Sequence, residues 1–354
     1  MNQLDLPGTP AKLVTEENVL AIISDAPLNT VSSAIYNGGC KKVKAILNIQ
    51  VPEGYSDRHL HKDPMHLVRE SAKKIGIHDN YLAMITAAKI INMSHVVKSD
   101  GNCMVNVVAT AGVSHGESAG EKIVAEQTEG TINIIVVVNG KPTDSCLIAA
   151  FVTATEAKTA ALNDLDIRSR YSGDAATGTI TDSLSVATTN TGPAIELGGP
   201  ASKLGQLVAF CVRRAVKEAV KKQDGTMPSR SIAVRLKARH LTLEKMASEL
   251  SKIESLNVDE KALVNKLMDI FCEPLYASFL MAAAKLDDDV ERGLIPVEFG
   301  DIAKVSQRFG GLISAGSRTE AKNQVHSTKK GSDMVDLPPF LKQALINIIR
   351  NESS

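Results

Sequence analysis

The sequence predicts an α+β fold, in which a mixed β-sheet is packed with long helices, followed by an all-helical C-terminal region. Between about Val14 and Lys222, short runs rich in Val and Ile alternate with helical runs. The run from Thr131 to Val138 is apolar on both faces, as expected of a central strand. After the polar stretch from Gly225 to Ser229, helical periodicity continues with little strand signal. We therefore expect one domain over residues 14–225 and a helical region over residues 230–354.

The expected strands are short runs with β-branched residues and turn-forming neighbours. They lie at residues 19–24, 30–36, 43–51, 102–113 and 131–138. The motif DAP separates the first two runs, and NGG separates the second from the third; both are typical of turns. A further run, Thr177 to Thr189, alternates polar and apolar residues and also predicts a strand.

Three helices are expected in the first domain. The run from Asp63 to Ile77 starts with Asp-Pro and has apolar residues at helical spacing. A second helix is expected from Asp144 to Leu165, after the motif PTDS. The third, Ser202 to Lys222, is amphipathic and has basic residues at its C-terminal end, where they suit the helix dipole. In the C-terminal region, apolar stripes predict packed helices: Leu263, Leu267, Ile270 and Phe271; Ile302, Val305 and Phe309; Leu341, Leu345, Ile348 and Ile349.

Composition excludes several classes of partner. The 40 basic and 40 acidic side chains balance, so there is no electrostatic reason to expect nucleic acid or an anionic membrane as a partner. Tryptophan is absent, which argues against base-stacking platforms. The most apolar run is far shorter than the roughly 20 residues of a membrane helix, and the N-terminus lacks the pattern of a signal peptide. The five scattered cysteines form no CxxC pair, so the expected compartment is the reducing cytoplasm.

Lys158 is the unusual residue of the helix expected from Asp144 to Leu165. It shares a face with apolar residues spaced three or four apart: Leu147, Phe151, Ala154, Leu162 and Leu165. Glu156 lies about 200° around the helix from Lys158, beside Thr153, so the two charges face different surroundings. Lys158 either extends to the helix edge or pairs with a carboxylate, or it is a partly desolvated amine that binds substrate or stabilises an oxyanion.

Asp182 is the unusual residue of the strand expected from Thr177 to Thr189. In a regular strand it falls on the apolar face, whereas Thr177 and Thr179 belong to a row of hydroxyls on the other face. A buried carboxylate is costly unless it is paired, so Asp182 and Lys158 are expected to meet. Their pair is either a structural salt bridge or a site between helix and sheet. The hydroxyls are either ordinary strand residues or candidate nucleophiles.

Glycine-rich turns and histidines are weaker candidates. The turns are Asn37 to Gly39, Ala111 to Glu121 and Glu196 to Gly205, and none has the spacing of a P-loop. Such turns present backbone N–H groups to ligands or simply connect elements tightly. His115 could act as an acid or base, or be an ordinary loop residue. The histidines of RHLHKDPMH (His59, His61 and His66) match no zinc pattern, so no metal site is expected.

Taken in order, seven segments resemble the adenosylcobinamide amidohydrolase family, which comprises corrinoid-salvage enzymes of archaea and some bacteria. The segments are SSAIYNGG, AILNIQV, TAGVSHGESAGE, GTINIIVVV, TATEAKTAALNDL, TGTITDSLSVA and GGPASKLGQLVAFCVRRAVKEAV. TATEAK, TGTITD and GTIN are the most distinctive. The resemblance extends over roughly residues 19–220, so it carries no expectation for the helical region.

The resemblance implies hydrolysis of one amide bond, which converts adenosylcobinamide to adenosylcobyric acid and 1-aminopropan-2-ol, with the corrinoid as substrate and no cofactor. Amide hydrolysis needs a nucleophile, a base and donors for the oxyanion. The candidate bases are Glu156 and Asp182, and Thr177 or Thr179 could instead be a nucleophile deprotonated by Lys158. The oxyanion donors would come from Lys158, Asn133 and the backbone near Gly178. The expected substrate-binding residues are Asn37, Gly38, Gly39, His115, Asn133, Thr153, Gly178, Gly198, Gly199 and Lys203.

Two other functions fit the same features. One is a corrinoid-binding protein without turnover, and the other is a hydrolase of a different amide. The helical C-terminal region could form a homodimer contact or a lid over the corrinoid.

Overall fold

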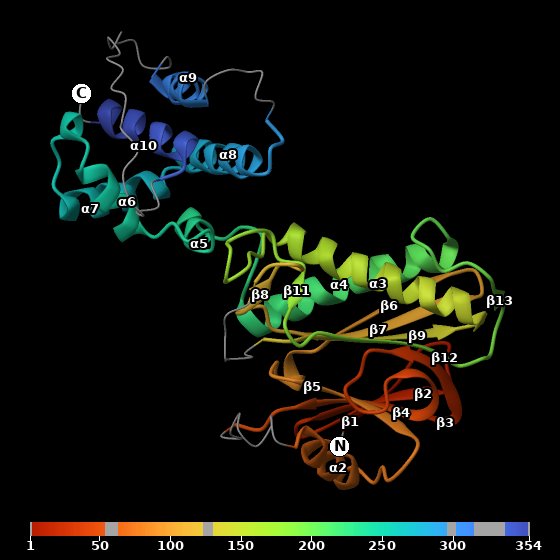
Figure 1. Cartoon of the computed structure of the whole chain (residues 1–354). Helices are drawn as coiled ribbons and strands as arrows, with labels where there is room; N and C mark the ends of the chain where they lie inside the picture. The colour runs from red at the N-terminus through yellow and green to blue at the C-terminus, as the bar shows by residue number, and fades with distance from the viewer. Residues whose placement is uncertain (1, 54–62, 123–129, 296–301, 315–336, 353–354) are drawn as a thin grey trace. The chain divides into compact units, whose positions relative to one another are not determined.

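The computed structural model describes residues 2–53, 63–122, 130–295, 302–314 and 337–352 (Figure 1). The chain divides into two compact units, residues 1–228 and residues 229–354. The first unit contains a large mixed sheet with long helices. The described residues of the second unit form helices. The predicted α+β class is confirmed.

Nine strands form the large sheet of the first unit. They are β1 (Asn2–Asp5), β2 (Ala11–Glu16), β3 (Val19–Ser32), β4 (Gly39–Gln50), β5 (Tyr81–Thr86), β6 (Ser94–Asp100), β7 (Cys103–Ala111), β9 (Ile132–Asn139) and β12 (Ser183–Thr188). The path β6-β7-β9-β12-β3-β4-β5 is continuous, and β2 followed by β1 extends from the N-terminal half of β3. The pairs β9–β12 and β4–β5 are parallel, whereas the others are antiparallel.

β3 corrects one prediction, because the two strands expected at residues 19–24 and 30–36 are one strand. The motif DAP does not form a turn; it lies in a bulge, where the register against β4 shifts between Ile23 and Leu28. Pro27 is tolerated there because a bulge residue needs no ladder hydrogen bond. The bulge divides the strand, so that its first half pairs with β2 and its second half with β12.

Four strands of the large sheet were not predicted: β1, β2, β5 and β6. β1 is fully exposed and Leu4 is its one apolar residue, and β6 is exposed over its second half, so neither shows an apolar pattern. β5 is the start of a longer apolar run that continues into the 3₁₀ turn Ile90–Asn92, and such a run does not by itself distinguish strand from helix.

The first unit has four layers (Figure 1). Helices α3 (Asp144–Asp164) and α4 (Lys203–Asp224) cover one face of β6, β7, β9 and β12. The sheet curls, so that the opposite face of β7, β9 and β12 packs against β2, β3, β4 and β5 around a shared apolar core. Helix α2 (Pro64–Lys74) closes the far side of β4 and β5. All three helices were expected from the sequence.

The ends of the two long helices are fixed by local capping. The hydroxyl of Thr143 accepts a hydrogen bond from the N–H of Cys146 at 3.2 Å, and Ser202 accepts one from Gly205 at 3.0 Å. Helix α4 ends at Gly225, which has a left-handed φ of 64°. Among the described helices, α3 has the length and composition of a membrane span. The bent pair α7 (Glu260–Cys272) and α8 (Pro274–Glu291) has them too if it is counted as one span. In α3 the apolar side chains pack into the core with α4 and the sheet.

The second unit contains helices α5 (Ile232–Lys237), α6 (Leu243–Ser251), α7 (Glu260–Cys272), α8 (Pro274–Glu291), α9 (Ile302–Ser314) and α10 (Pro339–Glu352), with a 3₁₀ turn at Glu254–Leu256. The apolar stripes predicted in α7 and α10 are buried in its core, and Val305 and Phe309 pack against that core. The side chain of Ile302 and the polar stretch at residues 315–336 lie outside the described residues. Buried Asp287 accepts hydrogen bonds from Phe340 N–H and Leu341 N–H, both at 2.8 Å, at the start of α10.

Candidate active site

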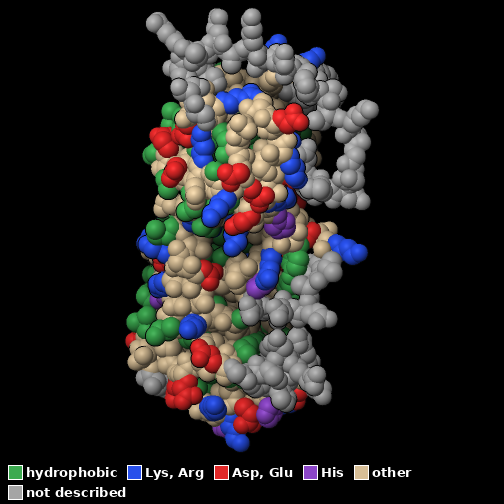
Figure 2. Space-filling view, turned by 90° about the vertical axis from the view of Figure 1, so that its left-hand side faces the viewer, with side chains coloured by type: hydrophobic (Ala, Val, Ile, Leu, Met, Phe, Trp, Pro, Cys, Tyr) green, Lys and Arg blue, Asp and Glu red, His purple; other side chains and the backbone are tan. Residues whose placement is uncertain are grey.

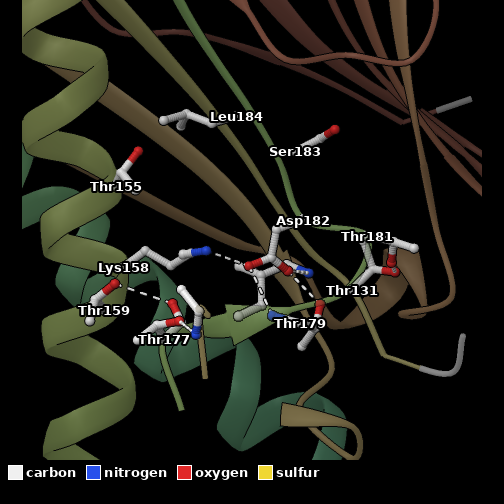
Figure 3. A network of polar contacts seen from close by, with 12 residues as sticks. Thr131, Thr155, Lys158, Thr159, Thr177, Thr179, Thr181, Asp182, Ser183 and Leu184 are labelled. Carbon is white, nitrogen blue, oxygen red and sulfur yellow. Dashed lines mark hydrogen bonds and ion pairs between the residues drawn. The ribbon is translucent and has the colours of Figure 1, made fainter. Parts of the chain in front are cut away.

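The candidate site lies where α3 meets the start of β12. Lys158 reaches from α3 to Asp182, and Thr179 reaches the same carboxylate from β11 (Gly178–Thr179) (Figure 3). β11 pairs with the two-residue strand β8 (Gly116–Glu117). The predicted meeting of Lys158 and Asp182 across the helix–sheet boundary is confirmed.

The continuous strand expected from Thr177 to Thr189 is wrong. The chain turns after β11 and starts a new strand, β12, at Ser183. The carboxylate of Asp182 stabilises this turn, because it accepts hydrogen bonds from the backbone N–H of Thr179 at 3.1 Å and of Ile132 at 2.9 Å. The predicted row of hydroxyls is therefore broken, and Thr181 is exposed whereas Thr179 is buried.

Asp182 is surrounded by hydrogen-bond donors. Besides the two backbone groups, its carboxylate accepts the Thr179 hydroxyl at 2.5 Å and the Lys158 ammonium. A carboxylate offers about four acceptor positions, so each of them is used. The side chains of Lys158 and Asp182 both keep 14% of their surface exposed. The ion pair is thus mostly buried and fully hydrogen-bonded on its acidic side, yet it still reaches the surface.

Gly178 makes room for this ion pair. A Cβ atom at position 178 would lie 2.5 Å from Asp182 Oδ2 and 2.7 Å from Lys158 Nζ. Its φ is not in the left-handed region, so the need for glycine comes from this close approach alone. The backbone N–H that binds the Asp182 carboxylate is that of the next residue, Thr179.

The two candidate threonine nucleophiles have different surroundings. Thr179 is buried and donates its hydroxyl proton to Asp182, so its nearest proton acceptor is that carboxylate, and not Lys158 as the sequence suggested. The hydroxyl of Thr177 accepts a hydrogen bond from Ala119 N–H at 2.9 Å. Among the described residues, the Thr177 hydroxyl makes no hydrogen bond to a basic group.

Glu156 is not brought to the cluster. It is exposed on α3, and no described residue forms a hydrogen bond or ion pair with its side chain. Lys158, two residues later, faces Asp182, so the expected separation of the two charges around the helix is confirmed. Of the two candidate bases, Asp182 alone lies beside Lys158 and Thr179.

Asn133 serves the sheet. Its amide nitrogen donates to Asn48 Oδ1 at 2.8 Å and to the Ile85 carbonyl at 2.9 Å, and its oxygen accepts from Ser183 N–H at 3.1 Å. Both amide protons are therefore used, and the side chain is 1% exposed. The residue ties β9 to β4, β5 and β12. The prediction that Asn133 supplies a donor for an oxyanion is therefore wrong.

The GG turn before α4 packs against the N-terminal half of α3. A Cβ atom on Gly198 would lie 2.2 Å from the Cys146 carbonyl oxygen, and buried Thr153 donates its hydroxyl to the Gly198 carbonyl at 3.0 Å. Cys146 precedes Lys158 by twelve residues, about 18 Å along a helix. The predicted binding residues Thr153 and Gly198 therefore bind each other and hold the turn on the helix; no hydrogen bond among the described residues joins their side chains to Lys158, Thr179 or Asp182. Gly199 belongs to this turn, and Lys203 pairs with Asp100 at 3.3 Å.

The NGG turn precedes β4. Asn37 donates its amide to the Tyr81 carbonyl at 3.0 Å, and both Asn37 and Gly39 have left-handed φ angles of 58° and 88°. A Cβ atom on Gly38 would lie 2.4 Å from the Ala34 carbonyl oxygen. The sequence of this turn is therefore explained by chain geometry.

Sequence reasoning missed Glu117, which lies in β8 directly opposite Gly178. Its Oε2 atom is buried and has no hydrogen-bond partner among the described residues. Burial raises the pKa of Glu117, and the nearby Asp182 charge raises it further. The sequence shows Glu117 only as a carboxylate within the glycine-rich stretch AGVSHGESAGE. The strand pair that brings it opposite Gly178 is two residues long, which is too short to produce a recognisable sequence pattern.

The remaining histidines do not form a metal centre within the described part of the chain. No group of three His, Cys, Asp or Glu residues could hold a metal ion there. His115 is buried, with Nδ1 at 3.3 Å from Ser114 Oγ and no partner for Nε2 among the described groups. His66 is exposed on α2, and His59 and His61 lie outside the described residues.

Comparisons with known proteins agree on the first unit. The family model described as adenosylcobinamide amidohydrolase matches residues 8–228. An uncharacterized protein of Methanocaldococcus jannaschii is 33% identical over 208 residues, which are 52% of this chain and 80% of that protein. The adenosylcobinamide amidohydrolase of Methanosarcina mazei is 31% identical over 190 residues, 51% of this chain and 84% of that protein. The family match ends at the boundary between the two units.

Solved structures give a more distant similarity. A protein from Pyrococcus horikoshii has a TM-score of 0.32 and 13% identity over 60% of this chain and 79% of its own. A β-aminopeptidase from Burkholderia sp. has a TM-score of 0.32 and 10% identity over 62% of this chain and 82% of its own.

Proposed function

Because this chain belongs to the adenosylcobinamide amidohydrolase family, we propose that it hydrolyses the aminopropanol amide of adenosylcobinamide. The products are adenosylcobyric acid and 1-aminopropan-2-ol, and the acid re-enters adenosylcobalamin synthesis. Membership of the family makes the chain an amide-bond hydrolase. The particular amide and its place in corrinoid salvage are the parts that we propose.

The Thr179–Asp182–Lys158 group is the observation that carries the proposal. A hydroxyl, a base within hydrogen-bond reach of it and a third group that orients the base form the usual arrangement of an activated nucleophile. Here Thr179 donates to Asp182 at 2.5 Å, and Lys158 pairs with the other oxygen of that carboxylate. The group is mostly buried but not sealed, which suits a reaction on an amide at the end of a substrate arm.

In this mechanism Thr179 Oγ attacks the amide carbon, and its proton moves to Asp182 along the existing hydrogen bond. No donor has to leave the carboxylate for this transfer. Lys158 has three N–H donors, of which Asp182 accepts one among the described contacts. The remaining donors can stabilise the oxyanion that develops on the carbonyl oxygen. Water then releases the acyl group from Thr179.

Direct attack by water is the alternative that the same residues allow, with Asp182 as the base. The two routes differ in the covalent acyl-enzyme. Thr179→Ala abolishes turnover in the first route and leaves measurable turnover in the second. Trapping a mass increase on the peptide that contains Thr179 would support the first.

The surface charge is compatible with a large, nearly neutral substrate that carries many amides. Basic and acidic side chains are interspersed on the described residues of the face in Figure 2, in agreement with the zero net charge. Such a surface gives no strong electrostatic selection of charged ligands. We also propose a cytoplasmic location, which the five free cysteines support.

The test is to incubate the pure protein with adenosylcobinamide and to measure released 1-aminopropan-2-ol by mass spectrometry. Release that depends on Asp182 and Lys158 is the expected result. Tight binding of the corrinoid without release would replace the proposal with a non-catalytic corrinoid-binding protein. Release of an amine from another amide only would identify a different substrate.

A further inference from the structure

We propose that Glu117 is the catalytic acid that protonates the leaving amine, and that it then serves as the base for the water that releases the acyl group. The inference rests on the proposed hydrolysis at Thr179. Asp182 receives the proton of Thr179, but the nitrogen that departs also needs one, because an alkylamide anion is a very poor leaving group. The base that takes the nucleophile's proton can pass it on, as the histidine of a Ser-His-Asp triad does. Asp182, however, already accepts four hydrogen bonds, so a second carboxyl group with a free oxygen at the same centre is better suited to this transfer.

Strand register places Glu117 at that centre. In the antiparallel pair of β8 and β11, Glu117 lies directly opposite Gly178, and opposite residues project their Cβ atoms from the same face, about 5 Å apart. The Cβ direction of Gly178 points straight at the ion pair, since a Cβ there would lie within 2.7 Å of both Asp182 Oδ2 and Lys158 Nζ. The side chain of Glu117 therefore starts on the face of β8 and β11 that carries the Lys158–Asp182 pair.

The two carboxylates of the site differ in their partners. Asp182 accepts four hydrogen bonds, whereas Glu117 Oε2 is buried without a partner in the described structure. A buried, unpaired carboxylate oxygen is costly unless it carries a proton or meets a donor from the substrate. Burial and the neighbouring Asp182 charge raise the pKa of Glu117, which favours the protonated form that a general acid needs.

Glu121, in the same loop, is already used by the protein. Its Oε1 atom accepts hydrogen bonds from Ser118 N–H and from the Ser169 hydroxyl, both at 2.6 Å. These bonds hold the loop that follows β8 against the segment that precedes β11. The Oε2 atom of Glu121, like that of Glu117, has no partner among the described groups. Although burial opposes it, hydrogen bonds from Ser169, Ser172 and Ser118 lower the pKa of Glu121, so Glu121 is held as a structural carboxylate and Glu117 is the one suited to carry a proton.

In acylation the Thr179 Oγ–C bond forms and the C–N bond breaks; the Thr179 proton goes to Asp182, and the Glu117 proton goes to the amine nitrogen. In deacylation the water oxygen bonds to the acyl carbon and the Oγ–C bond breaks; a water proton goes to Glu117, and the Asp182 proton returns to Thr179. The net reaction is amide plus water to carboxylic acid plus amine, and both carboxyl groups regain their starting states.

Glu117→Gln tests this role with two substrates. One is adenosylcobinamide, and the other is its ester analogue, in which oxygen replaces the amide nitrogen. An alkoxide leaves far more readily than an amide anion, so acid assistance matters less for the ester. We expect kcat/KM of Glu117→Gln to fall at least 10²-fold with the amide and by less than tenfold with the ester. Glu70→Gln, the same change on exposed α2, is the matched control.

The pH profile is the second readout. In the wild type, kcat/KM for the amide should fall at high pH as Glu117 loses its proton, and this limb should be absent in Glu117→Gln. Equal losses with amide and ester, or an unchanged high-pH limb, would overturn the assignment and leave Glu117 a structural residue. These outcomes require a wild type that releases aminopropanol, so failure of the proposed hydrolysis is recognised separately, by its absence in the wild type.

Discussion

Replacing Gly178 with alanine tests whether the Lys158–Asp182 pair acts as one unit of the site. The new methyl group would lie 2.5 Å from Asp182 Oδ2 and 2.7 Å from Lys158 Nζ, whereas contacts between such atoms need roughly 3.5 Å. The pair must therefore move by about 1 Å. A displacement of about 1 Å in an active site costs about 10²-fold in rate, equivalent to about 2.7 kcal/mol of activation free energy. Backbone strain adds nothing, since the φ of Gly178 is ordinary.

The assay is kcat for aminopropanol release, with circular dichroism to confirm folding. Gly311→Ala is the matched control, because a Cβ at position 311 in α9 meets nothing within 4 Å. Gly178→Ala should lower kcat less in a Lys158→Ala variant than in the wild type, because one of its two clashes is gone. The effects of the two substitutions on kcat should therefore not be additive. A folded Gly178→Ala variant with wild-type kcat would refute the link between the ion-pair geometry and catalysis.

Three further predictions concern stability and pH. Lys158→Ala should lower the free energy of unfolding by about 3 kcal/mol in urea denaturation, because the buried Asp182 charge loses its partner. Adding Asp182→Asn should recover part of this loss while the protein stays inactive, because the charge is removed and the amide oxygen still accepts from the backbone N–H groups. Asn133→Leu should lower the free energy of unfolding by about 1–3 kcal/mol, because it leaves the buried polar partners of Asn133 unpaired. An unchanged midpoint of urea denaturation would contradict the role of Asn133 in tying the strands together. Burial raises the pKa of Asp287 to about 6, above its unfolded value of about 3.9. Its protonated side chain therefore contributes about 3 kcal/mol to the free energy of unfolding below pH 4, and this stability is lost as pH rises through 6. Thermal melting of Asp287→Asn should not show this dependence on pH.

Periodicity identified the elements whose pattern is set by one continuous face. The helices α3 and α4 and the central strands β7 and β9 follow from apolar spacing alone. The same patterns exposed Lys158 and Asp182, because each is a charge on an otherwise apolar face and such charges need partners. Their contact could therefore be inferred from two separate segments without knowledge of the strand order.

The predictions from sequence were wrong where hydrogen bonds between distant segments determine the structure and the local apolar–polar pattern does not. Asp182 interrupts an alternating sequence, since its carboxylate binds the N–H groups of Thr179 and Ile132, and Ile132 is fifty residues earlier in the chain. Asn133 looks like a free polar group in a strand, but its partners come from β4, β5 and β12. Glu117 is placed by a pairing of two residues. None of these long-range contacts has a local sequence signature.

The contrast between Asp182 and Glu117 bears most directly on mechanism. Two carboxyl groups whose environments differ in this way are the usual basis for separate acid and base roles at one pH. Asp182 is surrounded by donors that fix its position and aim one oxygen at the Thr179 hydroxyl. Glu117 lies opposite Gly178 in the strand pair, and its buried Oε2 atom has no hydrogen-bond partner among the described groups. A single group can carry both protons, as the histidine of a Ser-His-Asp triad does. In the mechanism proposed for this chain, Asp182 is held by four donors, and Glu117 supplies a second carboxyl group for the leaving nitrogen.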